Sequence, residues 1–213
     1  MKYDSDKYKV YTWKNWMVLH YMLNPGIAVN ELLFGQRVPK ISVVDKTSEK
    51  PLIERSYVPC PNCETLHDGR TWSSQNGTAF RNWFGLYCPN CGEIIPCLRN
   101  VTAWLILFIT FPIWGWFRNS LKRKWLDKQP DRFSDIKTNE VINPFDGSKW
   151  LIEGLSWGVA TSVLLIIFFP IIGIDLLSKD VVFTVLALIV VGGPLFGLIM
   201  KLYFGRTGTK KLT

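Results

Sequence analysis

The sequence predicts a small β module held together by a metal ion and joined to an α-helical membrane region. That region consists of a two-helix hairpin and a shorter apolar helix before it. Three observations predict this fold class: two Cys-Pro-Asn-Cys tetrapeptides, three long stretches without charge, and basic residues that follow two of those stretches. Of the 213 residues 48% are hydrophobic, which excludes a disordered chain of low hydrophobicity.

The four paired cysteines form the pattern C-x2-C-x24-C-x2-C, which runs from Cys60 and Cys63 to Cys88 and Cys91. Two cysteines separated by two residues can direct both thiolates at one ion, and a second pair completes a tetrahedral set of ligands. We therefore expect a structural Zn²⁺ site with no open coordination position. The alternatives are two disulfides or four unrelated cysteines.

Residues beside the cysteines refine this prediction. Gly92 suits a turn whose backbone takes positive φ, whereas Glu64 holds the equivalent place in the first turn and fits it less well. His67 is an alternative ligand, but four cysteines already satisfy the ion. The fifth cysteine, Cys97, has apolar neighbours, so we expect a buried and unreactive thiol.

The first part of the chain is an apolar and amphipathic lead-in. Val10–Leu23 is rich in aromatic and aliphatic residues, and Asn24 followed by Pro25 favours a second helix that ends before Gly35. These two segments are predicted either to lie in the membrane interface or to pack on the rest of the protein as ordinary core. We expect His20 to be a packed side chain and not a ligand.

Short apolar runs around the cysteines predict the strands of a small antiparallel sheet. They are Val38–Lys46, Pro51–Pro59, Phe80–Tyr87 and Ile94–Leu98. A core of this size is marginally stable without a metal or disulfide, which is consistent with the predicted ion.

Three uncharged stretches predict membrane helices. Val101–Phe117 has 17 residues, Gly154–Ile174 has 21 and Val181–Met200 has 20. Because a helix rises 1.5 Å per residue and the hydrocarbon core is about 30 Å thick, the last two are long enough to span it. Only a short loop separates them, so they form a hairpin. The first stretch is predicted to span, and a re-entrant or interfacial helix is the alternative.

A basic cluster follows the first apolar stretch and consists of Arg118, Lys122, Arg123, Lys124 and Lys128. Such a cluster marks the cytoplasmic side and attracts anionic lipid, so we expect it to face lipid. The alternative is a stop-transfer segment without lipid specificity. The basic loop and the basic C-terminal tail both favour the cytoplasm, but the sequence leaves the side of the cysteine module open.

The predicted organisation has six parts. They are a lead-in over 1–50, the four-cysteine module over 51–99, a first apolar helix over 100–118, a basic and then polar connector over 119–153, a transmembrane hairpin over 154–204, and a basic tail over 205–213.

Val58–Cys63 and Gly85–Gly92 resemble the metal-binding turns of zinc-ribbon domains. The continuation, through Ile94–Leu98, Phe111–Trp116 and Arg118–Trp125, is similar to a group of bacterial membrane proteins of unknown function that carry one ribbon ahead of a few membrane helices. The resemblance implies a small β zinc ribbon, metal-ligand roles for the four paired cysteines, and a place in the bacterial inner membrane. It implies no activity.

These observations predict a non-enzymatic integral membrane protein. Its ribbon serves as a protein-interaction or assembly module, with Trp72, Trp83 and Phe84 as candidate contact residues, and its partners are the bilayer and another protein. One alternative is a membrane-embedded enzyme or lipid-interacting protein that uses residues at the membrane face, such as His20, His67 or Asp175. Another is a membrane-tethered nucleic-acid binder. Four basic and four acidic residues balance between Pro51 and Arg99, so no nucleic-acid partner is expected.

Overall fold

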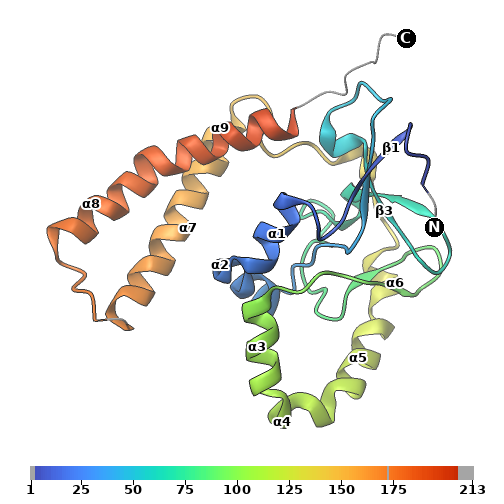
Figure 1. Cartoon of the computed structure of the whole chain (residues 1–213), viewed down its shortest axis with the longest axis horizontal. Coiled ribbons are helices and arrows are strands. Elements are labelled where there is room, and N and C mark those ends of the chain that lie inside the picture. Colours follow the sequence, from blue (N-terminus) through green and yellow to red (C-terminus); the bar gives the residue numbers. More distant parts are fainter. Residues whose placement is uncertain (1–2, 172, 206–213) are drawn as a thin grey trace. The chain divides into compact units, whose positions relative to one another are not determined.

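The structure, a computed structural model, describes residues 3–171 and 173–205 (Figure 1). It divides into two compact units. Among the described residues, the first comprises 3–50 and Glu54–Val141, and the second comprises Pro51–Ile53, 142–171 and 173–205. The basic tail predicted over 205–213 lies, beyond its first residue, outside the described residues.

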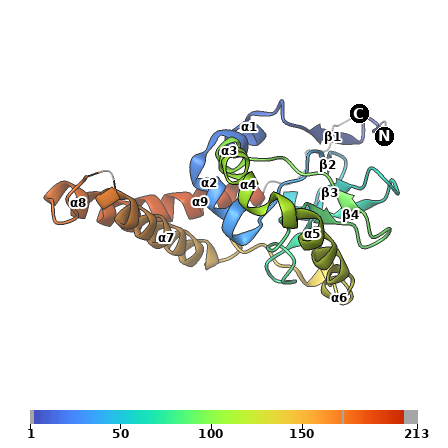
Figure 2. The same ribbon diagram turned by 90° about the horizontal axis from the view of Figure 1, so that it is seen from below.

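The first unit contains an antiparallel sheet of four strands in the order β1-β2-β3-β4, which Figure 2 shows side by side. Its strands are β1 (Tyr8–Tyr11), β2 (Ser42–Asp45), β3 (Ser56–Pro59) and β4 (Leu66–Asp68). The register places Val10 opposite Val43, and Val58 opposite His67. The antiparallel sheet and its strands β2 and β3 were predicted, but β1 and β4 were not. Tyr8–Tyr11 straddles the start of a segment that we expected to be helical, and Leu66–Asp68 lies in none of the predicted strands.

A second sheet consists of β5 (Leu86–Tyr87) and β6 (Ile94–Ile95), which pair antiparallel. The strand predicted over Phe80–Tyr87 is therefore wrong for its first six residues. The backbone leaves the extended region there, with φ of +60° at Arg81 and +137° at Gly85. The buried side chain of Asn82 holds this loop by donating to the backbone oxygens of Thr78 and Ala79.

The lead-in contains α1 (Trp16–Leu23), α2 (Pro25–Val29) and the π-helical turn η1 (Asn30–Phe34). The second helix begins at Pro25 and ends before Gly35, whose φ is +64°, as the sequence predicts. Ala28 and Glu31 are buried, so part of this segment packs on the protein, while Trp16 and Leu23 are exposed and a location in the membrane interface stays a prediction. The prediction that His20 is a packed side chain is wrong, because the side chain is exposed and its Nε2 lies 3.3 Å from Nδ2 of Asn24.

A bent arm follows the second sheet in the same unit. It consists of α3 (Val101–Ile109), α4 (Phe111–Trp114), the 3-10 turn η4 (Gly115–Phe117), α5 (Arg118–Asp127) and α6 (Gln129–Arg132). The expected single helix breaks at Thr110, two residues before Pro112, and its two parts are inclined at 62°. Figure 1 shows the chain leaving the sheet along α3, turning at α4 and returning along α5. The remaining 3-10 turns are η2 (Leu52–Glu54), η3 (Gly69–Trp72) and η5 (Thr138–Glu140).

The second unit is a helical hairpin of α7 (Lys149–Ile171), α8 (Lys179–Ala187), the π-helical turn η6 (Leu188–Gly192) and α9 (Gly193–Phe204). Two of its segments, Lys149–Ile167 and Lys179–Phe204, are long and apolar enough to cross a membrane, which agrees with the predicted hairpin.

Glycines allow the two helices of the hairpin to approach closely. A Cβ atom added to Gly154 would overlap the carbonyl oxygen of Gly193, and one added to Gly197 would overlap that of Trp150. The rings of Trp157 and Phe196 stack beside this contact, with their centroids 4.4 Å apart. Small residues four positions apart therefore set the distance between the helices.

Replacing Gly197 by alanine should push α9 away from α7, because the backbone of α7 occupies the space that the methyl group needs. We expect Gly197→Ala to lower the stability of the hairpin by about 1–3 kcal/mol, measured as a lower melting temperature in detergent micelles. Gly192→Ala is the matched control, since its added Cβ would lie 3.5 Å from Leu188, an ordinary contact. Equal melting temperatures for the two variants would contradict this packing.

Candidate metal centre

The two cysteine pairs lie in the loops of two β-hairpins. Cys60 and Cys63 connect β3 to β4, and Cys88 and Cys91 connect β5 to β6. All four Sγ atoms lie within 4.8 Å of one another. The fold therefore brings together the four residues that the sequence singled out.

The distances between the sulfur atoms distinguish metal ligands from disulfides. The Sγ atoms of Cys60 and Cys91 are 3.7 Å apart, and so are those of Cys63 and Cys88. A disulfide requires about 2.05 Å, whereas four thiolates placed tetrahedrally at about 2.3 Å from one ion lie about 3.8 Å from each other. All four thiols are free. The cluster is thus compatible with a metal site.

The two loops repeat one backbone pattern. The amide of Cys60 donates to the oxygen of Thr65, and that of Glu64 donates back to Cys60, each at 3.0 Å. In the second loop Cys88 donates to Glu93, and Gly92 donates back to Cys88, each at 2.9 Å. This tight turn directs the thiolates inward and leaves both cysteines of a pair on the same side.

The residue after each pair adopts positive φ, +58° at Glu64 and +75° at Gly92. The left-handed conformation is open to glycine and unfavourable for a residue with a Cβ atom. Glu64 therefore takes the strained position that the comparison of the two loops predicts.

Polar side chains surround the sulfur atoms. Nε2 of His67 lies 3.1 Å from Sγ of Cys88, and Nδ2 of Asn62 donates to Sγ of Cys91 at 3.6 Å. Burial lowers the pKa of His67, which favours a neutral ring whose N–H can donate to a thiolate. His67 thus contacts a ligand from outside the four-sulfur group, in a position that orients the ligand and offsets its charge.

The thiols differ in how readily they ionise. Hydrogen bonds from Asn90 and Thr65 lower the pKa of Cys63 to about 5. Burial raises the pKa values of Cys60 and Cys88. A cation among the four sulfur atoms would offset that desolvation, so this donor set fits a bound metal ion.

Cys97 takes no part in this group. Its thiol donates to the backbone oxygen of Ile95 at 3.5 Å, and burial raises its pKa to about 11. At neutral pH the thiol stays protonated, which agrees with the unreactive cysteine that we expected, but the side chain is half-buried and not fully buried as predicted.

The predicted lipid-facing cluster lies on α5, and Lys128 follows directly after the helix. Arg118, Arg123, Lys124 and Lys128 are exposed, and Lys122 is half-buried. Among the described residues, the ion pairs join other side chains, namely Glu31 with Arg37, Asp68 with Arg70, and Glu140 with Lys137. The contact of this cluster with lipid remains a prediction.

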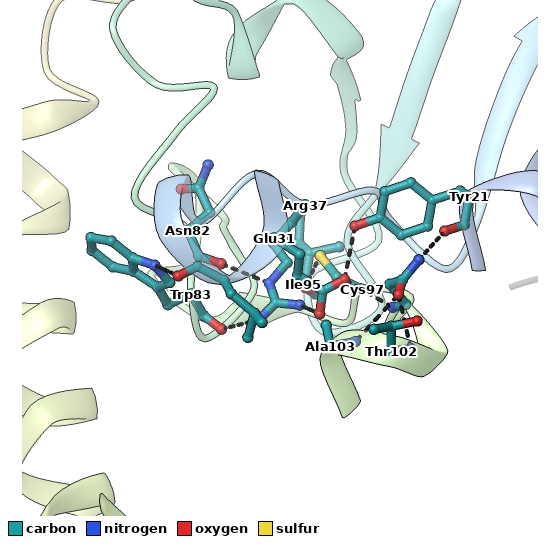
Figure 3. A network of polar contacts seen from close by, with 11 residues as sticks. Tyr21, Glu31, Arg37, Asn82, Trp83, Ile95, Cys97, Thr102 and Ala103 are labelled. Atoms are coloured by element: carbon teal, nitrogen blue, oxygen red, sulfur yellow. Dashed lines mark hydrogen bonds and ion pairs between the residues drawn. The ribbon is translucent and has the colours of Figure 1, made fainter. Parts of the chain in front are cut away.

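Sequence reasoning missed a buried polar network around Glu31, which Figure 3 shows. The carboxylate of Glu31 is fully buried and pairs with the guanidinium of Arg37. It also accepts hydrogen bonds from the Tyr21 hydroxyl, at 3.1 Å, and from the Asn100 amide, at 2.9 Å. The side chain of Asn100 caps α3 and donates to the backbone oxygens of Tyr21 and Asn24. An asparagine before an apolar run is a helix-start signal, so this cap was detectable.

Replacing Glu64 by glycine should stabilise the first loop, because glycine adopts positive φ without steric cost. We expect a gain of about 0.5–1 kcal/mol in the free energy of unfolding, measured by thermal unfolding of the full chain. Gly92→Ala should lower the free energy of unfolding by a similar amount. Its added Cβ would meet only the Tyr87 hydroxyl, at 3.7 Å, so this variant tests the backbone conformation alone. A destabilised Glu64→Gly variant would show that the carboxylate has a role of its own.

Comparison with known proteins gives a match to one domain family. Residues 11–107 match a family model described as "Domain of unknown function (DUF8250)". The matched range includes both cysteine loops, the buried Glu31 network and most of α3. No curated protein and no solved structure matches the chain.

Proposed function

We propose that this chain is a non-enzymatic integral membrane protein in which a zinc ribbon serves as a protein-interaction or assembly module. The hairpin α7–α9 is the membrane anchor. The observation that carries this proposal is the saturated site: four thiols converge on one point and leave no position for a substrate or an activated water. Such a site supports structure and not catalysis.

Zinc is the ion that this donor set favours. Four soft thiolates in a tetrahedral arrangement are typical of zinc and of iron–sulfur proteins, and zinc adds no redox chemistry. The sulfur spacing of 3.7 Å is consistent with a single ion. Each loop also donates backbone amides to its first cysteine, from Asn62 and Cys63 in one and from Asn90 and Cys91 in the other. These amides offset the negative charge of four thiolates around one divalent ion.

The surface we assign to a protein partner differs from the one that the sequence indicated. Trp72 packs against the core around the cysteines, and Phe84 packs on Trp125. Trp83, by contrast, is 40% exposed, and its indole N–H donates to the backbone oxygen of Leu32. It belongs to an aromatic patch, the exposed side chains of Leu33, Phe34, Phe80 and Trp83.

Contacts within the chain hold the aromatic patch together. The rings of Phe34 and Phe80 meet edge to face with their centroids 6.2 Å apart. The backbone amides of Arg81 and Asn82 donate to the oxygens of Phe34 and Gly35, which joins the two segments that carry the patch. Rigid, exposed aromatic side chains supply much of the binding energy at protein interfaces, since little conformational entropy is lost on binding.

The purified protein should contain one equivalent of zinc by elemental analysis. Cys88→Ser should remove most of the metal and unfold the ribbon, because it withdraws one of four ligands and the contact with His67. Cys97→Ser is the control, and it should keep the metal, since Cys97 lies outside the four-sulfur group. Protein isolated without stoichiometric metal, or with disulfides between the paired cysteines, would refute the zinc ribbon.

A partner protein should be captured at the aromatic patch. We expect a photo-crosslinking residue at Phe80 to give one discrete adduct in native membranes, and one at Ser74, an exposed polar position in the same ribbon, to give none. Phe34→Ser combined with Trp83→Ser should abolish the adduct without loss of zinc. Repeated recovery of the parent protein alone in gentle detergent, with no adduct, would argue against an interaction module.

A further inference from the structure

We propose that the arm α3–α5 is a re-entrant hairpin that dips into an anionic lipid leaflet from the side on which the ribbon lies. Val101–Phe117 then enters the membrane without crossing it, and the ribbon shares a compartment with the basic cluster. The inference rests on the membrane anchoring in the proposed function. It adds the side of the ribbon and a second contact with lipid.

The start of the arm is attached to the first compact unit at Asn100. Its backbone amide donates to the buried Glu31 carboxylate, and its side-chain amide donates to the oxygens of Tyr21 and Asn24 at 2.8 and 2.7 Å (Figure 3). Arg37, the ion-pair partner of Glu31, donates in turn to the backbone oxygen of Trp83. The start of α3 is therefore tied to both the lead-in and the ribbon.

The end of the arm is attached to the same unit at Trp125. This buried residue donates its indole N–H to the backbone oxygen of Arg81 at 2.6 Å, and its ring packs on Phe84. Seven residues later, at the end of α6, Arg132 donates to the backbone oxygen of Phe80 at 2.8 Å. Phe133 lies against Tyr87, the residue before the ligand Cys88, with ring centroids 5.3 Å apart.

Because both ends of the arm are attached to one folded unit, they constrain how deeply the arm can enter a membrane. A segment that crosses the bilayer must release its ends on opposite sides, about 30 Å apart across the hydrocarbon core alone. Here the start of the arm bonds to the lead-in and its end packs on the 80–84 segment, and both belong to the same compact unit. The nine residues of α3 rise about 14 Å, which is roughly half of that core. The arm therefore has the length and the connectivity of a hairpin that enters one leaflet.

The tip of the arm is apolar and unpartnered among the described residues. Its exposed side chains are Phe108, Ile109, Phe111, Ile113, Trp116 and Phe117, and the exposed fraction reaches 76% at Ile113 and 86% at Trp116. Such a surface is unfavourable in water and suits acyl chains with an interfacial tryptophan.

The polar groups at the bend are satisfied within the arm itself. The Thr110 hydroxyl donates to the oxygen of Ile106 at 2.7 Å and accepts from the indole N–H of Trp114 at 3.1 Å. The indole N–H of Trp116 donates to the oxygen of Pro112 at 3.1 Å. Hydrocarbon offers no hydrogen-bond partners, so a helix break inside a leaflet needs this kind of internal pairing.

Charge identifies the leaflet. The basic cluster Arg118, Lys122, Arg123, Lys124 and Lys128 follows the tip directly, and no described acidic residue forms an ion pair with it. Cations at the edge of an inserted apolar segment attract anionic headgroups. The apolar tip of the arm is therefore complementary to the acyl chains of an anionic leaflet, and the basic cluster is complementary to its headgroups.

Accessibility labelling of the full chain in membrane vesicles of both orientations tests the side of the ribbon. Ser74→Cys and Asn139→Cys place exposed thiols before and after the arm, and Leu177→Cys places one in the loop of the hairpin. An impermeant maleimide should reach the first two from one side and Leu177→Cys from the other, after subtraction of the label on the parent protein.

Each other outcome of the labelling overturns a different claim. Labelling of Ser74→Cys and Asn139→Cys from opposite sides would show that Val101–Phe117 spans the membrane and would overturn the re-entrant arm. Labelling of all three from one side, or release of the protein by alkaline carbonate, would remove the proposed anchor and the inference that rests on it.

A nitroxide at Ile113→Cys tests the lipid contact. In vesicles of phosphatidylcholine with phosphatidylglycerol, oxygen should relax this label more than a polar nickel reagent does, and a label at Ser74→Cys should show the reverse. The preference for oxygen should fall in phosphatidylcholine alone, and also when Lys122, Arg123 and Lys124 are all replaced by glutamine. A label open to the nickel reagent, one shielded from both reagents, or one indifferent to phosphatidylglycerol would overturn the proposal.

Discussion

The convergence of four sulfur atoms is the constraint on which the ribbon depends. The two hairpins that carry them belong to separate sheets, β1–β4 and β5–β6, with no strand pairing between the sheets. The buried side chains around the cysteines are few, chiefly Val58, Leu86 and Ile95. A core of this size gains little free energy from apolar burial, so its cohesion requires an additional link between the hairpins. The thiol cluster supplies that link at the centre of the core.

The other parts of the first unit attach to the two hairpins through the pairing of β2 with β3 and through polar contacts. The lead-in joins the ribbon where the amide of Asn82 meets the oxygen of Gly35, and where Arg37 donates to the oxygens of Asn82 and Trp83. Glu31 is buried at that junction, and its negative charge is tolerated because a guanidinium and two hydrogen-bond donors surround it. In the proposed zinc ribbon, loss of the metal would propagate to the lead-in and the arm, since both are attached to the 80–84 segment that precedes β5.

The sequence predicts most accurately what short-range patterns determine. The ligand set follows from residues two apart within each loop, and the hairpin α7–α9 follows from the absence of charge over a membrane-length stretch. The strand β1 depends instead on pairing with β2, whose residues lie more than thirty positions further along the chain. Trp72 and Phe84 could not be recognised as core residues for the same reason. Their neighbours, among them Trp125, come from segments distant in sequence.

The bend in α3–α5 shows why hydropathy alone leaves topology open. Hydropathy measures how well a stretch tolerates lipid, and Val101–Phe117 tolerates it as well as a spanning helix does. Whether the stretch crosses depends on where its two ends are held, which is a property of Asn100 and Trp125 and not of the apolar residues between them. In the proposed re-entrant arrangement, the positive-inside rule and the preference of four-cysteine sites for reducing compartments assign the same side. A straight span would satisfy only one of the two rules, so the proposed arrangement removes a conflict that sequence patterns leave unresolved.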